Sequence, residues 1–140
     1  MTRDETQRFF DRRLDAWKRH DVEALTLDHA EGCVLESPLA GHVAGRGAIE
    51  HVYRGFLASF PDFAVEHSDL IVEGGRVVQM VTMSGTNTGG FMGLPPTGKH
   101  FRFPAVLVFT LRDGRIVRER RIYDFTGFLM EVGVLKAKPL

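Results

Sequence analysis

Cysteine and long apolar runs are both scarce in this sequence. Cys33 is the single cysteine, so the chain forms no intrachain disulfide and no cysteine-based metal cluster, and a reducing, cytoplasmic setting is favoured. No apolar stretch approaches the roughly 20 residues that a membrane-spanning helix needs. The charged residues 1–5 also lack the apolar core of a signal peptide. We therefore expect a soluble intracellular protein.

An excess of charge of one sign is absent as well. Lys plus Arg number 18 and Asp plus Glu number 18, which argues against a nucleic-acid partner and against binding to a membrane surface. The basic run at residues 112–121 is broken by Asp113 and Glu119, and we interpret it as a solvated strand face. With 44% hydrophobic residues and no repeat or linker, residues 1–140 are expected to form one domain.

Helical periodicity dominates the first 60 residues. Phe9, Phe10, Leu14 and Trp17 share one face of a predicted helix, and Arg13 belongs to the basic side opposite. Asp21 is the predicted N-cap of a short second helix. After a brief strand at residues 33–36, residues 46–60 predict a third helix, which Pro61 ends. Its apolar stripe consists of Ile49, Val52, Tyr53, Phe56 and Phe60.

Strand patterns follow Pro61. Segments rich in Val, Ile, Phe and Thr, separated by turn signals at 73–75 and 113–114, predict strands at residues 63–72, 77–88, 100–111 and 115–123. Residues 125–132 predict a last helical turn or two, ended by Gly133. Helices followed by an antiparallel meander are typical of the α+β class. We expect a strongly curved, mostly antiparallel sheet wrapped around the N-terminal helices, which forms an open cone with an apolar interior.

A lone carboxylate, Asp124, stands between Tyr123 and Phe125 at the end of the last predicted strand. An acid is costly to bury unless it is paired, protonated or used in chemistry. In a strand, Ile122 and Asp124 share one face. If that face lines the interior, Asp124 enters an apolar enclosure, which suits a group that takes and returns a proton. The alternative is that Asp124 caps the helical turn after it.

Several motifs occur in an order that carries a family resemblance. They are Glu-Gly-Gly-Arg-Val-Val at 73–78, Gly-Thr-Asn-Thr-Gly at 85–89, Gly-Leu-Pro-Pro-Thr-Gly-Lys at 93–99, Asp-Gly-Arg-Ile-Val at 113–117 and Asp-Phe-Thr-Gly-Phe-Leu at 124–129. Together they resemble the SnoaL-like polyketide cyclase family of the NTF2-like superfamily. The resemblance covers nearly the whole chain.

The resemblance implies a cone-shaped NTF2-like α+β barrel and an intramolecular aldol-type ring closure without metal or cofactor. The substrate would be a polyketide-like or other hydrophobic carbonyl compound, with Asp124 as the general acid/base. A histidine is usual in the family where this chain has Asn87, which hydrogen-bonds but does not shuttle a proton near neutral pH. Asn87 would then orient a carbonyl or enolate oxygen. A homodimer or larger homo-oligomer is also implied.

Other relatives of this fold fit the residues less well. Residues 35–38 resemble the ketosteroid isomerases, but Ser37 stands where their aspartate base belongs and residues 8–17 contain no tyrosine. Residues 83–87 lack the arginine and acid that limonene epoxide hydrolases would place on that strand. A module without chemistry, which binds a small hydrophobic ligand or serves as a protein-interaction domain, is the remaining alternative, and Asn87 favours it.

Further residues are predicted to contact the ligand, each with a core or turn role as the alternative. No metal site is expected, because the six histidines lack the close spacing of a metal motif. His67 alternates with Phe63 and Val65, so it is predicted to face the interior. The remaining predicted contacts are Ser37, Trp17, Phe56 and Met80.

Overall fold

The computed structural model describes residues 1–136, except for the side chain of Ser68. The three predicted N-terminal helices are present as α1 (Arg3–Lys18), α2 (Val22–Leu27) and α3 (Arg46–Ser59). The predicted cap of α2 is confirmed, since the Ala24 N–H donates to Asp21 Oδ1 at 3.0 Å. Helix α3 ends at the residue before Phe60, as the proline at 61 predicts.

The strands form one six-stranded sheet in the order β2-β1-β6-β5-β4-β3. Its neighbours pair antiparallel except β1 and β6, which are parallel. The short edge strand β2 was not predicted. The strand bounds are β1 (His29–Ser37), β2 (Gly41–Ala44), β3 (Ala64–Glu73), β4 (Arg76–Thr86), β5 (His100–Arg112) and β6 (Arg115–Ile122).

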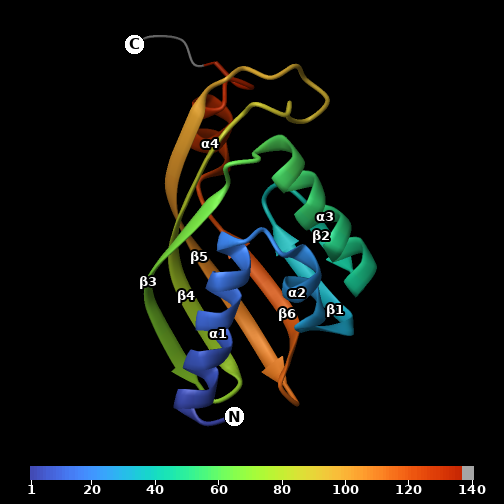
Figure 1. Cartoon of the computed structure of the whole chain (residues 1–140), viewed down its shortest axis with the longest axis vertical. Helices are drawn as coiled ribbons and strands as arrows, with labels where there is room; N and C mark the ends of the chain where they lie inside the picture. Colours follow the sequence, from blue (N-terminus) through green and yellow to red (C-terminus); the bar gives the residue numbers. More distant parts are fainter. Residues whose placement is uncertain (137–140) are drawn as a thin grey trace.

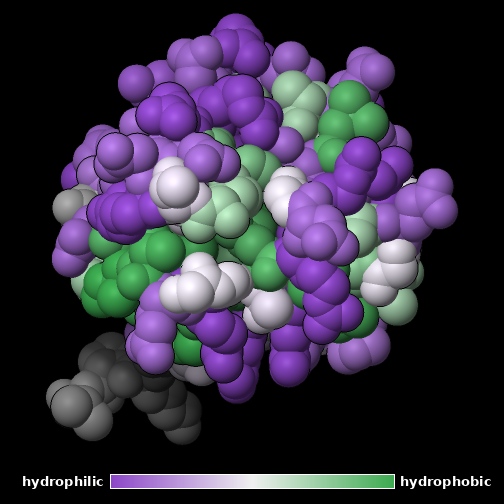
Figure 2. All heavy atoms as spheres, turned by 90° about the horizontal axis from the view of Figure 1, so that it is seen from below, coloured by the Kyte–Doolittle hydropathy of each residue, from purple (hydrophilic) through white to green (hydrophobic). Residues whose placement is uncertain are grey.

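The curved sheet wraps around the N-terminal helices, so the predicted α+β cone is confirmed. Figure 1 shows α1, α2 and α3 against one face of the sheet, with α4 (Phe125–Glu131) at the upper end beside the loop that joins β4 to β5. The lower end is mostly covered by hydrophilic side chains, with apolar ones visible between them (Figure 2). Within residues 1–136, no helix has both the length and the apolar character to cross a membrane.

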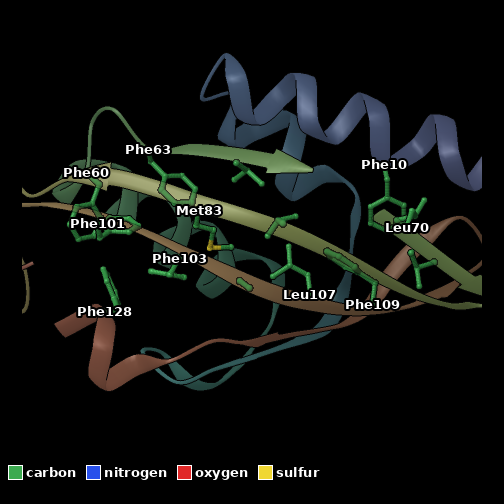
Figure 3. Packing of buried hydrophobic residues seen from close by; sticks show 14 of the residues in the cluster. Phe10, Phe60, Phe63, Leu70, Met83, Phe101, Phe103, Leu107, Phe109 and Phe128 are labelled. Atoms are coloured by element: carbon green, nitrogen blue, oxygen red, sulfur yellow. The ribbon is translucent and has the colours of Figure 1, made fainter. Parts of the chain in front are cut away.

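Aromatic side chains fill the space between the helices and the sheet. Phe101, Phe103 and Phe109 alternate along β5 and are at most 8% exposed, as their spacing predicts. Phe10 points from α1 toward the sheet (Figure 3), and its ring centre lies 4.9 Å from that of Phe109. Phe128 of α4 closes the upper end, with its ring centre 4.8 Å from that of Phe101.

Candidate functional site

A narrow cavity lies between helices α1 and α3 and the inner face of the sheet. The volume open to the centres of water molecules is about 30 Å³. This is room for about two waters. A fused-ring ligand therefore enters only if lining side chains move. The apolar lining includes Leu14, Trp17, Leu39, Val52, Phe56, Phe63, Val65, Met83, Phe103, Leu107 and Phe109, and the polar lining is Arg13, Ser37, Tyr53, Gln79, Glu119, Arg121 and Tyr123.

Two pairs of nearly parallel rings stand in the cavity wall. Trp17 stacks on Tyr53 with ring centres 5.1 Å apart, and Phe103 stacks on Tyr123 at the same distance. Phe56 meets Phe63 edge-on at 4.8 Å. Trp17 and Phe56 thus lie where the sequence predicted them. That they contact a ligand remains a prediction.

A β-bulge in β6 decides which of its side chains face the cavity. Leu111 pairs with Ile116 but Thr110 pairs with Arg118, so Val117 is one extra residue in the ladder. An extra residue reverses the inside–outside alternation beyond it. As a result Glu119, Arg121 and Tyr123 face inward, and Ile122 points outward with 46% exposure.

Glu119 is the most enclosed carboxylate of the cavity wall, with only 1% of its side chain exposed. Its Oε1 accepts the Tyr53 hydroxyl at 2.6 Å and contacts His29 Nε2 at 2.8 Å. Its Oε2 accepts the Arg121 Nε–H at 2.7 Å. His29 Nδ1 meets the Leu25 carbonyl oxygen at 3.2 Å, so both nitrogens of this ring face oxygen atoms.

Arg13 extends this polar network toward α2. The prediction that it lies on a solvated helix face is wrong, because the residue is 3% exposed. Its Nη1 donates to the Leu25 carbonyl oxygen at 2.9 Å and to Asp28 Oδ2 at 3.0 Å. Its Nη2 lies 3.4 Å from the Tyr53 hydroxyl. The buried cation is therefore matched by a nearby carboxylate, as a buried charge requires.

The network shifts the ionisation of its members. Burial opposes the charge on Glu119, but Arg121, His29 and Arg13 outweigh it and hold the pKa of Glu119 well below its ordinary value. Burial, reinforced by the Glu119 charge, raises the pKa of Tyr53. Burial also raises the pKa of Tyr123, with Arg121 opposing. Near neutral pH the site thus presents one carboxylate and two neutral phenols.

A surface groove lies next to the cavity and is defined by Glu36, Ser37, Pro38, Gly41, His42, Arg120, Arg121, Ile122 and Tyr123. Ser37, Arg121 and Tyr123 line both the groove and the cavity. The two parallel strands β1 and β6 end here. Ser37 also keeps a turn role, since its Oγ accepts the Ala40 N–H at 2.8 Å.

Asp124 lies outside the cavity, so the condition that the Ile122–Asp124 face lines the interior is not met. The residue is exposed and is the N-cap of α4, where its Oδ1 accepts the Gly127 N–H at 3.0 Å. The physical reason is the extra residue Val117, which turns this face outward. The geometry thus agrees with the capping alternative, and catalysis by Asp124 remains a prediction.

Asn87 does not line the cavity either. It is 1% exposed, and its Nδ2 donates to Thr97 Oγ1 at 3.1 Å and to the Val132 carbonyl oxygen at 3.3 Å. Thr97 Oγ1 donates to the same carbonyl oxygen at 2.6 Å. In this position Asn87 fastens the β4–β5 loop to the end of α4.

Met80 and His67 are also absent from the cavity wall. Met80 alternates with the inward-facing Gln79 and Val81 on β4, so it points to the outer face of the sheet and its predicted place is wrong. His67 pairs with Val81, which puts it on the inner face as predicted, but beyond the cavity lining. Its Nε2 is buried and makes no hydrogen bond.

Sequence reasoning missed the polar centre formed by Arg13, His29, Tyr53, Glu119 and Arg121. A usable signal was present in β6, where Glu119, Arg121 and Tyr123 alternate, but the residues that pair with them lie far away in the sequence. As to cofactors, the residues from 1 to 136 contain no group of three or more His, Cys, Asp or Glu side chains arranged to hold a metal ion.

The curved sheet over three helices has the NTF2-like fold. An NTF2-like protein of unknown function from Burkholderia pseudomallei superposes with a TM-score of 0.79 at 16% identity, covering 90% of this chain and 95% of that chain. Within this class, the chain belongs to the SnoaL-like polyketide cyclase family, whose model matches residues 7–132.

Two solved Streptomyces structures are more similar in sequence. AclR of Streptomyces galilaeus, a candidate hydroxylase, is 25% identical with a TM-score of 0.84, covering 99% of this chain and 91% of that chain. IdmH of Streptomyces antibioticus, a candidate polyketide cyclase, is 30% identical with a TM-score of 0.75, covering 91% of this chain and 98% of that chain. No curated protein matches the chain.

Proposed function

We propose that this protein is a cofactor-independent cyclase that acts by proton transfer on a polyketide-like or other hydrophobic carbonyl compound held in the cavity. The observation that carries the proposal is the set Glu119, Arg121 and Tyr123, which faces a cavity lined mostly by apolar and aromatic side chains. Membership of the SnoaL-like polyketide cyclase family supports it, as does the likeness to IdmH.

In this proposal Glu119 is the acid/base. Its carboxylate takes a proton from the carbon next to a carbonyl group, and the resulting carbanion attacks a second carbonyl carbon of the same molecule. A carbon–carbon bond forms, and the oxygen of the second carbonyl takes the proton back from Glu119. Tyr123 and the Gln79 amide, which also line the cavity, donate hydrogen bonds to the enolate oxygen, where donors fixed in an apolar enclosure are most effective.

Asp124 is the competing assignment, drawn from the family resemblance. Glu119 is the better supported of the two, because it lies in the cavity wall whereas Asp124 caps α4 at the surface. For Asp124 to reach a bound ligand, the start of α4 would have to move. Matched carboxamide variants, Glu119→Gln and Asp124→Asn, separate the two assignments.

Hydrogen–deuterium exchange tests the proposal without knowledge of the natural substrate. A panel of hydrophobic cyclic ketones such as 2-tetralone is incubated with the protein in D₂O, and loss of the α-proton signal is followed by NMR. We expect the wild-type protein to accelerate exchange, Glu119→Gln to lose roughly 100-fold or more of the acceleration, and Asp124→Asn to retain it. No acceleration by the wild-type protein across the panel would contradict an enzymatic function.

A non-catalytic module that binds a small hydrophobic molecule is the second candidate. The observation in its favour is that both oxygens of Glu119 already accept hydrogen bonds and that its pKa is held low, which makes it a weak base. Trp17 is the only tryptophan and lines the cavity, so its fluorescence reports ligand binding. Binding without α-proton exchange would favour this second candidate.

A further inference from the structure

The Arg121 guanidinium has more N–H donors than the neighbouring acceptors of the protein can take up. A guanidinium group carries five N–H donors. Its Nε–H is taken by Glu119 Oε2 at 2.7 Å, and its central carbon lies 4.8 Å from the centre of the Tyr53 ring, whose hydroxyl is close enough to interact with it. Beyond Glu119 and Tyr53, no side chain or carbonyl within residues 1–136 accepts a hydrogen bond from Arg121.

The position of Arg121 makes these unpaired donors significant. Only 11% of its side chain is exposed, and it stands where the cavity meets the surface groove. The Nη atoms of Arg121 are not among the buried polar atoms that lack a partner, so any free N–H group is open to the groove, where a ligand acceptor is a charge-assisted partner. A ligand in the cavity that carries an acceptor at its outer end supplies that partner.

The balance of charge favours a negatively charged acceptor. Glu119 interacts with two guanidinium groups, those of Arg121 and Arg13. Asp28 offsets Arg13, with 3.0 Å between their charged atoms. Arg12 also pairs with Asp28, at 2.8 Å. The three arginines therefore face only two carboxylates, Asp28 and Glu119. At the groove, Arg120 adds to the positive side, while Glu36 is paired with Arg118.

From these contacts we infer that the ligand of this cavity is a hydrophobic aromatic acid, whose carboxylate binds the Arg121 guanidinium at the cavity mouth. The planar guanidinium end matches a planar carboxylate in two parallel hydrogen bonds. The stacked ring pairs Trp17–Tyr53 and Phe103–Tyr123 suit a flat aromatic body. The inference specifies the substrate class of the proposed enzyme and rests on that function only for the place of binding.

Acid binding would also strengthen Glu119 as a base. A ligand carboxylate on Arg121 brings a second negative charge toward Glu119 and draws part of the guanidinium charge away from it. Both effects raise the pKa of Glu119 from its depressed value in the free protein. An uncharged analogue that fills the same cavity leaves Glu119 a weak base. This coupling makes the ligand charge part of the proposed chemistry.

The test compares two fluorescent ligands of the same shape, anthracene-2-carboxylate and anthracene-2-carboxamide, by titration against Trp17 emission. We expect the wild-type protein to bind the acid roughly 10-fold or more tightly than the amide, the difference typical of hydrogen bonds to a charged group. Arg121→Gln should remove this preference while the amide still binds. Arg121→Lys, which keeps the charge but loses the planar fork, should retain only part of it.

Arg115→Gln is the matched control, because Arg115 lies on the same strand, is exposed and lines neither the cavity nor the groove. It should keep the full preference. If Arg121→Gln does not fold, Glu119→Gln/Arg121→Gln avoids an unpaired buried charge and takes its place. Equal affinity of the wild-type protein for acid and amide, no saturable acid binding, or a preference that survives loss of Arg121 would each overturn the inference.

The result is separable from that of the exchange assay. An acid preference without α-proton exchange would leave the aromatic-acid site intact and remove the enzymatic function. Exchange without an acid preference would support the enzymatic function and remove the aromatic-acid site.

Discussion

The Tyr53 hydroxyl donates a hydrogen bond to Glu119 Oε1 at 2.6 Å, across 66 positions of the sequence. The bond joins α3 to β6, and His29 brings β1 to the same carboxylate oxygen at 2.8 Å. Three elements therefore meet at one buried charge. Because a buried carboxylate must keep its donors, this centre holds the helix layer in register with the sheet and gives the cavity a polar floor.

Removal of the Tyr53 hydroxyl should destabilise the protein. Tyr53→Phe takes one donor from a buried carboxylate, so we expect the free energy of unfolding to fall by about 1–3 kcal/mol. Urea denaturation measures the change, and a double-mutant cycle with Glu119→Gln should give a coupling energy above about 0.5 kcal/mol. Arg118→Gln, which breaks an exposed ion pair, should change stability by less than about 1 kcal/mol. Additive effects of the Tyr53 and Glu119 substitutions would contradict the direct bond.

Stability should fall in acid because of Glu119. Its pKa in the folded protein lies below the ordinary 4.5, so between these two values the unfolded chain binds a proton that the folded protein does not. The stability that Glu119 contributes is therefore complete above pH 4.5 and is lost as the pH falls through the lower folded-state value. Urea midpoints measured from pH 7 down to about 3 should drop more steeply for the wild-type protein than for Glu119→Gln. Parallel curves for the two proteins would contradict this account.

The helices and long strands were predictable because each depends on periodicity within one segment. The face of β6 was not, since Ile116 is buried and unbroken alternation from it turns Ile122 and Asp124 inward. The extra residue Val117 reverses which side chains face inward beyond it. A bulge depends on how two strands pair rather than on the local sequence pattern. The prediction that Arg13 is solvated was wrong for a related reason. Its burial depends on the ion pair with Asp28, and Asp28 lies outside the helix whose pattern was read.

Asp124 gives a prediction that separates capping from catalysis. Asparagine is as good an N-cap as aspartate, whereas alanine costs about 0.5–2 kcal/mol. We therefore expect Asp124→Asn to keep both stability and α-proton exchange, and Asp124→Ala to lose stability while it keeps exchange at temperatures where it stays folded. Thermal unfolding and the NMR exchange assay provide the two readouts. If Asp124→Asn abolished exchange in a folded protein, the catalytic role drawn from the resemblance would stand.

The homodimer implied by the family resemblance can be tested on the outer face of the sheet. Ile71 of β3 is 52% exposed and Ile122 at the end of β6 is 46% exposed, so both offer apolar area to a partner. If this face joins two protomers, Ile71→Glu should shift the sedimentation coefficient from dimer to monomer, because a charge buried in the interface lacks a partner. Leu27→Glu, equally exposed at 55% but on α2, is the control and should leave the dimer intact. A wild-type protein that sediments as a monomer would remove the dimer proposal.

Two glycine-to-alanine substitutions should change stability in opposite directions. A Cβ at Gly89 would lie 1.8 Å from the Ala58 carbonyl oxygen and 2.9 Å from its carbon, and both atoms belong to the backbone of α3. Gly89 also donates its N–H to the Ser59 carbonyl oxygen at 3.1 Å, so the close approach fixes the loop after β4 to the end of that helix.

Gly89→Ala should therefore push the loop away and cost about 1–3 kcal/mol. Gly55 is the control within α3, since a Cβ there meets nothing within 4 Å, and Gly55→Ala should stabilise the protein by about 0.4–1 kcal/mol because alanine restricts the unfolded chain. Urea denaturation gives both free energies. Hydrogen exchange should show faster opening of residues 87–99 only in Gly89→Ala. A Gly89→Ala protein as stable as the wild type would show that the loop reaches its position without this contact.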